Sequence, residues 1–339
     1  MKTYRKNMVT NHKETHGTKP GKKRGSTFSQ LREDYRSTLK SMDTEEHIDL
    51  AFYRPIGYVW ARLAKYFGIT PNAITIASIF LGIGAGVAFY FPSLGINLIG
   101  MALLIWANSF DSADGQLARM THQYSRIGRI LDGLSGDFWF ATIYVAICLR
   151  VNMTSQFFMQ HHWMIWTMAV LAGICHGKQA AMADAYRQWH LFFLKGKDGS
   201  ELENSFHLKK KLAAMTWRHN FWQKLTMGFY TNYTLQQEAT TPALQRLRHE
   251  LVVRFGSANM APQSFRDEFR RRSLPLMKYT NILSFNWRTI ALFVSLFLEM
   301  PWLYFAFELT VFNLILVMMI VRHERICKKL TKELKDGKY

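Results

Sequence analysis

Six stretches of the chain combine the length and the apolar composition of membrane-spanning helices. The hydrocarbon core of a bilayer needs about 20 residues of α-helix. The stretches are residues 72–92, 94–117, 130–150, 163–182, 287–301 and 302–321. The sequence therefore predicts an all-α integral membrane protein with six transmembrane helices.

The boundary between the last two stretches is the least marked. Pro301 is the only clear break between them, and proline interrupts a helix. Together the two stretches could instead form a tight hairpin or one bent helix. The length of 339 residues suits six spans and a polar appendage.

Basic residues are distributed unevenly around these spans. The chain holds 43 Lys and Arg against 24 Asp and Glu, a net charge of +19. Lys and Arg lie before the first span, between the second and third spans (Arg119, Arg126 and Arg129), between the fourth and fifth spans, and after the sixth, whereas the other three connections hold few or none. The positive-inside rule therefore predicts a multi-pass protein with both termini in the cytoplasm. Such charge suits the anionic inner leaflet, so we expect membrane lipids rather than nucleic acid as partners.

Two features precede the first span. Residues 1–46 are rich in Lys, Ser, Thr and Gly and are predicted to be a basic disordered tail. Residues 48–67 repeat apolar side chains at helical spacing, with Arg54, Arg62 and Lys65 between them. This pattern favours an amphipathic helix in the membrane interface, and a solvent-facing linker helix is the alternative.

A polar segment separates the fourth and fifth spans. Residues 188–283 are too polar to cross a membrane and too long for a simple loop. We expect a helical cytoplasmic insertion of two to four helices there. The predicted domains are the tail at 1–46, a membrane core at 47–187, the insertion at 188–283, helices five and six at 284–322, and a basic C-terminal tail at 323–339.

Three aspartates mark the joint between the second and third spans. Asp111 and Asp114 are three residues apart and share one helix face, and Asp132 joins them from the start of the next helix. Carboxylates in the membrane zone are costly and tend to mark function. Three converging carboxylates form a hard-oxygen site that suits Mg²⁺ or Mn²⁺.

Small and basic residues surround these aspartates. Gly115, Ala118 and Gly128 leave room for a ligand near the backbone, and Arg119 and Arg129 offer planar forks for phosphate. The combination predicts a metal and diphosphate site at the cytoplasmic mouth, with interhelical salt bridges as the alternative. Transporters and channels also hold intramembrane carboxylates, but rarely with this spacing of glycine and arginine.

The spacing resembles the signature of the CDP-alcohol phosphotransferases, D-x2-D-G-x2-A-R-x8-G-x3-D-x3-D. The positions that match are Asp111, Asp114, Gly115, Ala118, Arg119, Gly128 and Asp132. Arg54, and the run from Pro71 to Thr75 at the start of the first span, are also similar to the family. The resemblance covers about residues 50–190 and does not extend to the insertion.

The resemblance implies an enzyme that moves a phosphoalcohol from a CDP-linked donor, such as CDP-diacylglycerol, to the hydroxyl of a lipid or polyol acceptor. CMP would leave, in phospholipid or sphingolipid biosynthesis, at an active site that faces the cytoplasm in a homodimer. Asp111, Asp114 and Asp132 would bind Mg²⁺ or Mn²⁺. The cytidine nucleotide pocket would be formed by Asp114, Gly115, Ala118, Arg119, Gly128 and Arg129.

One position departs from the family pattern. Gly136 stands where the last motif aspartate, the expected general base and ligand of a second metal, should be. Asp137 follows directly, but an offset of five residues from Asp132 rotates a side chain about 140° away from the required face. The remaining possibilities are that a π-bulge near Gly136 lets Asp137 act beside Asp132 as a catalytic residue, that His176 or His190 is the base, or that the protein binds nucleotide or lipid without turnover.

The end of the fourth span holds the candidate acceptor residues. The resemblance places basic groups near this point, so we expect Lys178, Asp184 and Arg187 to line the acceptor side. A local ion pair between Asp184 and Arg187 at the membrane edge is the alternative.

Overall fold

The computed structural model describes residue 35 and residues 41–196 and 204–339, and these are largely α-helical without a strand. Side chains are not described at positions 126, 127, 129, 130, 217–220 and 222. Contacts divide the chain into residues 1–37 and residues 38–339, and the helices given below all belong to the larger unit. Most of the predicted tail, residues 1–34 and 36–40, lies outside the described residues.

Two long helices pack closely against a third, α3. The three are α3 (Pro71–Tyr90), α4 (Leu94–Thr121) and α5 (Arg126–Thr154). Glycines on α3 allow the close approach, since a Cβ at Gly82 would lie 2.0 Å from Cδ1 of Trp139 and one at Gly86 would lie 2.7 Å from Cγ2 of Thr142. Small residues let helix backbones approach in this way, so α3 packs on α5 as well as on α4.

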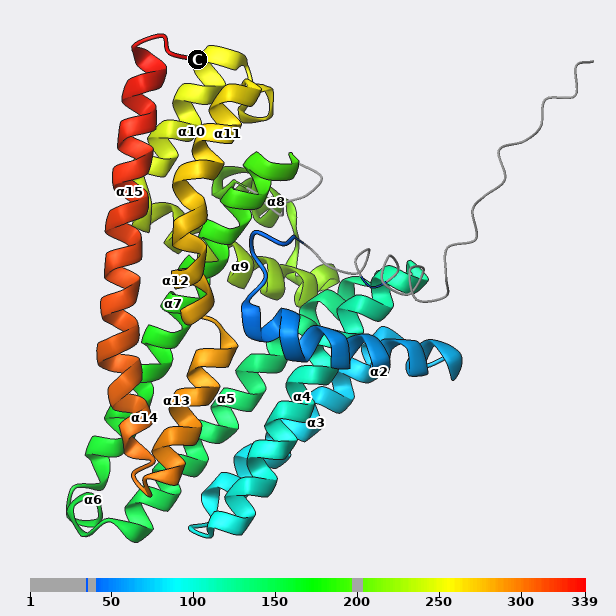
Figure 1. Cartoon of the computed structure of the whole chain (residues 1–339), viewed down its shortest axis with the longest axis vertical. Helices are drawn as coiled ribbons and strands as arrows, with labels where there is room; N and C mark the ends of the chain where they lie inside the picture. The colour runs from blue at the N-terminus through cyan, green and yellow to red at the C-terminus, as the bar shows by residue number, and fades with distance from the viewer. Residues whose placement is uncertain (1–34, 36–40, 197–203) are drawn as a thin grey trace, which may run out of the picture. The chain divides into compact units, whose positions relative to one another are not determined.

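A second group of helices follows the short helix α6 (Gln156–Gln160). It consists of α7 (His162–Lys195), α13 (Phe285–Phe297), α14 (Trp302–Phe307), the π-helical η5 (Glu308–Phe312) and α15 (Asn313–Lys335). A turn at 298–301 joins α13 to α14, and the chain reverses there (Figure 1). The last two predicted spans therefore form a tight hairpin and not one bent helix.

A buried ion pair links this second group. Arg288 on α13 is 1 % exposed and donates from Nη1 to both carboxyl oxygens of Glu308, at 2.6 Å each. Its Nη2 donates to Oε1 of Gln179 on α7 at 2.7 Å, and the Tyr304 hydroxyl donates to Glu308 at 2.7 Å. A buried pair is tolerated when its remaining polar atoms are hydrogen-bonded in this way, so α7, α13 and η5 are held in one register.

Within the part of the chain that the structure describes, four helical segments are long and apolar enough to cross a membrane: Pro71–Tyr90, Leu94–Thr121, Leu131–Thr154 and Trp302–Lys335. The protein is thus an all-α membrane protein. The predicted span 163–182 lies within α7, and α13 has only 13 residues, about 20 Å at 1.5 Å per residue. The count of six spans stays a prediction. The connections between α3 and α4, between α5 and α7, and between α13 and α14 lie at one end of the long helices (Figure 1).

The segment between α7 and α13 contains more helices than we expected. Five α-helices replace the predicted two to four: α8 (Ser205–Ala214), α9 (Trp217–Thr240), α10 (Pro242–Phe255), α11 (Gln263–Ser273) and α12 (Met277–Ile282). Short 3₁₀ turns, Ala258–Met260 and Leu274–Leu276, lie beside α11. Buried Phe193 of α7, Phe265 and Phe269 of α11, and Leu330 of α15 share one apolar cluster. The insertion therefore packs on the ends of α7 and α15.

The predicted amphipathic helix is divided into two parts, the π-helical η1 (Asp49–Tyr53) and α2 (Arg54–Tyr66). α2 runs across the long helices (Figure 1) and packs on α4, and its buried positions are the small residues Gly57, Ala61 and Ala64. The apolar stripe stays exposed instead, at Phe52, Val59, Leu63 and Phe67. An exposed apolar stripe with basic neighbours supports the interfacial reading over a solvent-facing linker.

Candidate metal and nucleotide site

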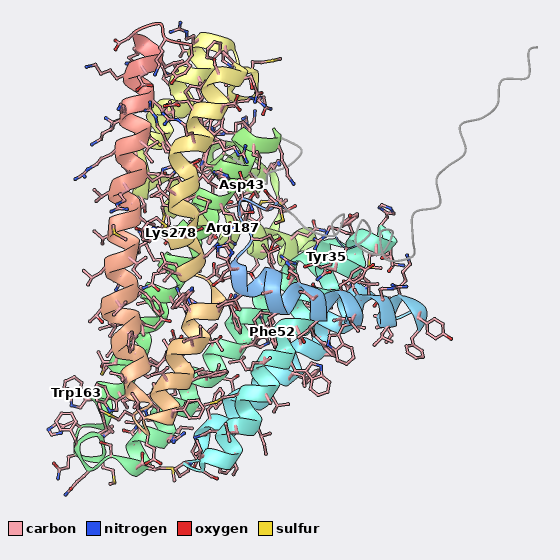
Figure 2. All side chains as sticks on the ribbon, in the orientation of Figure 1. Tyr35, Asp43, Phe52, Trp163, Arg187 and Lys278 are labelled. Atoms are coloured by element: carbon pink, nitrogen blue, oxygen red, sulfur yellow. The ribbon has the colours of Figure 1, made fainter. Side chains whose placement is uncertain are left out.

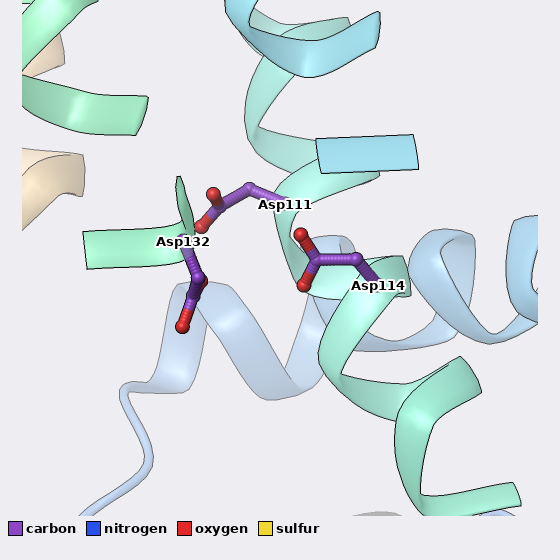
Figure 3. Close-up of side chains that lie close together, drawn as sticks. All are labelled: Asp111, Asp114 and Asp132. Atoms are coloured by element: carbon purple, nitrogen blue, oxygen red, sulfur yellow. The ribbon is translucent and has the colours of Figure 1, made fainter. Parts of the chain in front are cut away.

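A short reversal of the chain brings the three motif aspartates together. α4 is followed by His122, which is left-handed with φ 54°. α5 begins after Ser125, whose hydroxyl accepts from the Gly128 N–H at 2.8 Å. Asp111, Asp114 and Asp132 each offer a carboxylate oxygen, and these atoms lie within 4.8 Å of one another. Figure 3 shows Asp111 and Asp114 pointing from α4 toward Asp132 on α5.

Neutral hydroxyls fix two of these carboxylates. Asp114 is 4 % exposed, and its Oδ2 accepts from Oγ1 of Thr75 on α3 at 2.5 Å. Asp111 is half-buried, and its Oδ1 accepts from Oγ of Ser135 on α5 at 2.8 Å. Asp132 is exposed. A buried carboxylate held by a hydroxyl keeps lone pairs for a cation, and carboxylate oxygens are the ligands that Mg²⁺ and Mn²⁺ prefer. The donor set therefore fits a divalent metal.

The motif glycines have different surroundings. A Cβ at Gly115 would lie 3.4 Å from Nη1 of Arg119, so the guanidinium lies beside this glycine. A Cβ at Gly128 would lie 2.3 Å from Oδ1 of Asn72, whose oxygen accepts from the Ser125 hydroxyl at 3.0 Å. Gly128 therefore makes room for a contact between α3 and the start of α5.

Residues 68–186 match the sequence model of the CDP-alcohol phosphatidyltransferase family. The chain contains a CDP-alcohol phosphatidyltransferase domain. This finding confirms the resemblance stated from the motif, and the matched range includes Asp111, Asp114 and Asp132. Neither the curated proteins nor the solved structures yield a match to the chain.

The helix that carries Asp137 in the phosphatidyltransferase domain is regular. α5 is α-helical from Arg126 to Thr154, so the predicted π-bulge near Gly136 is wrong. Asp137 is exposed and lies outside the aspartate cluster, because five residues of regular helix turn it away from Asp132. A Cβ at Gly136 would meet no atom within 4 Å. The space at position 136, where the motif has its last aspartate, is therefore unfilled. The geometry of α5 gives no support for a catalytic role of Asp137.

The two histidines proposed as alternative bases have structural partners. His176 Nδ1 is 3.1 Å from the Tyr144 hydroxyl, and its ring packs on Phe140, two helical turns or about 12 Å beyond Asp132 along α5. His190 is fully buried, with Nδ1 at 2.8 Å from Oγ of Ser273 and Nε2 at 3.2 Å from Oδ2 of Asp43. Neither imidazole faces the aspartates.

The predicted acceptor residues are not gathered at one point. Lys178 is exposed, and nine residues of α7 place it on the face opposite Arg187. Asp184 accepts from the Tyr233 hydroxyl at 3.4 Å, and Arg187 donates from Nη2 to Oγ of Ser284 at 2.9 Å. Asp184 and Arg187 thus take separate partners rather than forming the alternative local ion pair.

Two further candidates were missed by the sequence analysis. Thr75 and Ser135 contact the aspartates directly, and each is a hydroxyl residue within a helix that is otherwise rich in apolar side chains. A polar side chain in such a helix is a weak signal by itself, because serine and threonine often bond to their own helix. Ala118 is half-buried on α4, and the Arg129 side chain lies outside the described residues.

Proposed function

We propose that the protein transfers a phosphoalcohol from a CDP-linked donor to an acceptor hydroxyl and releases CMP. The observation that carries the proposal is the convergence of Asp111, Asp114 and Asp132 within a CDP-alcohol phosphatidyltransferase domain. Family membership accounts for the donor class, and the carboxylates account for the metal that a diphosphate donor requires.

Mg²⁺ or Mn²⁺ would be held by these three aspartates. When bound, the metal supplies positive charge that neutralises the diphosphate and stabilises the CMP leaving group. Thr75 and Ser135 orient the carboxylates of Asp114 and Asp111. The nucleotide would lie against the open backbone at Gly115 and beside Arg119, with Ala118, Gly128 and Arg129 completing the pocket.

The proposed setting is phospholipid or sphingolipid biosynthesis. CDP-diacylglycerol or a small CDP-alcohol would be the donor, and inositol, glycerol phosphate, diacylglycerol, a long-chain base or ceramide would be the acceptor. The basic flanks support a cytoplasmic active site with both termini on the same side, and the family supports a homodimer. The exposed apolar stripe of α2 supports entry of a lipid substrate from the membrane surface.

Purified protein in detergent micelles tests the reaction. CMP release from CDP-diacylglycerol is measured with each of these acceptors, with Mg²⁺, with Mn²⁺ and with EDTA. We expect release that needs both an acceptor and a divalent metal. Failure of every donor and acceptor pair, including small CDP-alcohols, would contradict the proposal.

A second candidate function rests on Gly136. The missing carboxylate favours a membrane protein that binds nucleotide or lipid without turnover. Metal-dependent binding of CDP by a protein that releases no CMP would identify this function.

A further inference from the structure

A buried acid and a half-buried acid outside the matched domain share one amide. Glu46 precedes η1 and is 6 % exposed, and Asp49 begins η1. Asn286 on α13 is 5 % exposed and donates from Nδ2 to Oε2 of Glu46 and to Oδ1 of Asp49, at 2.8 Å each. The N-terminal segment is therefore tied to α13 by a polar contact that apolar packing does not require.

Several polar atoms at this contact lack a hydrogen-bond partner among the described residues. They are Oε1 of Glu46, Oδ1 of Asn286 and Nε of Arg187, all buried. Arg187 is a neighbour, since its Nη2 donates to Ser284, two residues before Asn286, and its charge lowers the pKa of Glu46 and Asp49 (Figure 2). A buried polar group without a hydrogen-bond partner is destabilising, so such atoms call for a ligand or water.

A hydroxyl group complements these atoms. Its proton can be donated to Oε1 of Glu46 or Oδ1 of Asn286, and its oxygen can accept from Nε of Arg187. A neutral hydroxyl adds no charge beside Glu46, Asp49 and Arg187. The chemistry therefore fits the hydroxyl group of an alcohol.

The acids lie beside the face of α4 and α5 that carries the metal site. Tyr53, the last residue of η1, hydrogen-bonds to Asn108, which is one turn before Asp111 on α4. On the α5 side, the Phe285 ring packs edge-on against Trp139 at 5.6 Å between centroids, one turn beyond Ser135. α4 and α5, which hold Asp111 and its partner Ser135, are thus in contact with η1 and α13, which hold Asp49 and Asn286.

We propose that Glu46, Asn286 and Arg187 bind the acceptor hydroxyl and that the Glu46 carboxylate is the general base. This inference rests on the proposed function. All three residues lie outside the range 68–186 that matches the family. The donor half of the site then belongs to the domain, and the acceptor half is supplied by its flanks, which replace the carboxylate missing at Gly136.

The step transfers one proton and one phosphoryl group. The acceptor O–H proton moves to the Glu46 carboxylate as the acceptor oxygen bonds to the phosphorus that bears the donor alcohol. The bond from this phosphorus to the CMP oxygen breaks, CMP leaves with the electron pair, and Glu46 later releases the proton to water.

Burial and Asp49 raise the pKa of Glu46 to about 7, against the lowering effects of Asn286, Arg187 and the Trp287 indole. The neutral Tyr53 phenol also lies near these acids. A base with a pKa near the working pH is efficient.

The test compares Glu46→Gln, Glu46→Asp and a matched control, Glu250→Gln, which alters a partly exposed glutamate on α10. CMP release from CDP-diacylglycerol with the acceptors named above is measured from pH 5 to 9, and metal-dependent CDP binding is measured in parallel. We expect Glu46→Gln to lower turnover about 100-fold or more, the scale of a positioned base, with CDP affinity unchanged within about twofold. The fall in CMP release at acidic pH should disappear in Glu46→Gln. Glu46→Asp should retain part of the wild-type rate.

Other outcomes separate this inference from the proposed function. An active wild type with a Glu46→Gln variant of equal turnover and an unchanged fall in CMP release at acidic pH would overturn the role of Glu46 alone. Equal losses in Glu46→Gln and Glu46→Asp, together with lost CDP binding, would show a structural role and also overturn it. A wild type that releases no CMP would overturn both.

Discussion

Two of the proposed metal ligands accept hydrogen bonds from hydroxyl residues of neighbouring helices. Thr75 and Ser135 each hold one carboxylate in a fixed direction without neutralising it. A basic partner would compete with a bound cation, whereas a hydroxyl leaves the carboxylate charge available. These two contacts are therefore compatible with a bound divalent metal.

Asparagine at any of the three aspartates keeps the side-chain shape and removes one anionic ligand. We expect Asp111→Asn, Asp114→Asn and Asp132→Asn each to lower CMP release by about 100-fold or more, because the metal stabilises the leaving group. Thermal unfolding should change little. Asp336→Asn, at an exposed position after α15, is the matched control. Near-normal release in all three variants would remove the assignment of the metal site.

Glu46 should make stability depend on pH. Its pKa is raised from the ordinary 4.5 to about 7, mainly by burial. The carboxyl is neutral below pH 4.5 in both states, and its contribution to stability is lost as pH rises through about 7. The rise of this pKa from 4.5 to about 7 corresponds to a decrease in the free energy of unfolding on the order of 3 kcal/mol. Glu46→Gln should thus unfold like the wild type at pH 5 and be more stable at pH 8, as measured by denaturant unfolding in detergent. Lower stability of the variant at both pH values would contradict this account.

Because α5 is a regular helix, Asp137 does not take the place of the aspartate that the motif has at position 136. An aspartate at 136 would be four residues after Asp132 and on the same helix face, where the added Cβ meets no atom within 4 Å. Asp137 is one residue too far on the unbroken helix. The helix thus leaves room at position 136 for the aspartate that the motif would place there.

Gly136→Asp should therefore be accepted and should strengthen metal binding. We expect the variant to fold, since aspartate is no worse than glycine within a helix, and to need several-fold less Mg²⁺ or Mn²⁺ for half-maximal CMP release. Gly133→Asp is the matched control, because its Cβ site is equally open but its position does not share the face of Asp132 at four-residue spacing. An unchanged metal requirement in Gly136→Asp, or an equal gain in Gly133→Asp, would argue against a vacant ligand position.

Much of this element-level organisation follows from local sequence patterns. Apolar length predicted α3, α4 and α5, and the spacing of Asp111, Asp114 and Asp132 predicted their convergence because a short turn joins the two helices that carry them. The partners of the aspartates and the contact of Glu46 with Asn286 were not predictable. Glu46 and Asn286 are 240 residues apart, and only tertiary packing brings such pairs together. The hypothesis of a π-bulge near Gly136 was wrong because glycine permits a distortion of the helix without requiring one.

At the level of the whole molecule, the flanks of the matched domain meet one another. Asp43 precedes Glu46 in the N-terminal segment, and its Oδ2 accepts from Nε of Arg270 on α11 at 2.6 Å. The same oxygen is 3.2 Å from Nε2 of the buried His190 (Figure 2). The insertion thus holds the segment that carries Glu46, which would give the helices between α7 and α13 a role in the proposed acceptor half of the site.

Breaking the contact between Asp43 and Arg270 should impair turnover more than nucleotide binding. In Arg270→Gln, Asp43 loses a bidentate partner, so the segment before η1 gains freedom and Glu46 is held less firmly against Asn286. We expect a several-fold fall in CMP release at saturating acceptor, with metal-dependent CDP affinity unchanged, because the nucleotide site lies within the domain. The cost in stability should be only about 1 kcal/mol, since Arg270 is partly exposed.

Arg271→Gln is the control, because Arg271 pairs only locally, with Glu268 on its own helix. Equal effects of the two substitutions, or a loss of CDP binding in Arg270→Gln, would show that the insertion acts on the fold as a whole and not through the segment that holds Glu46.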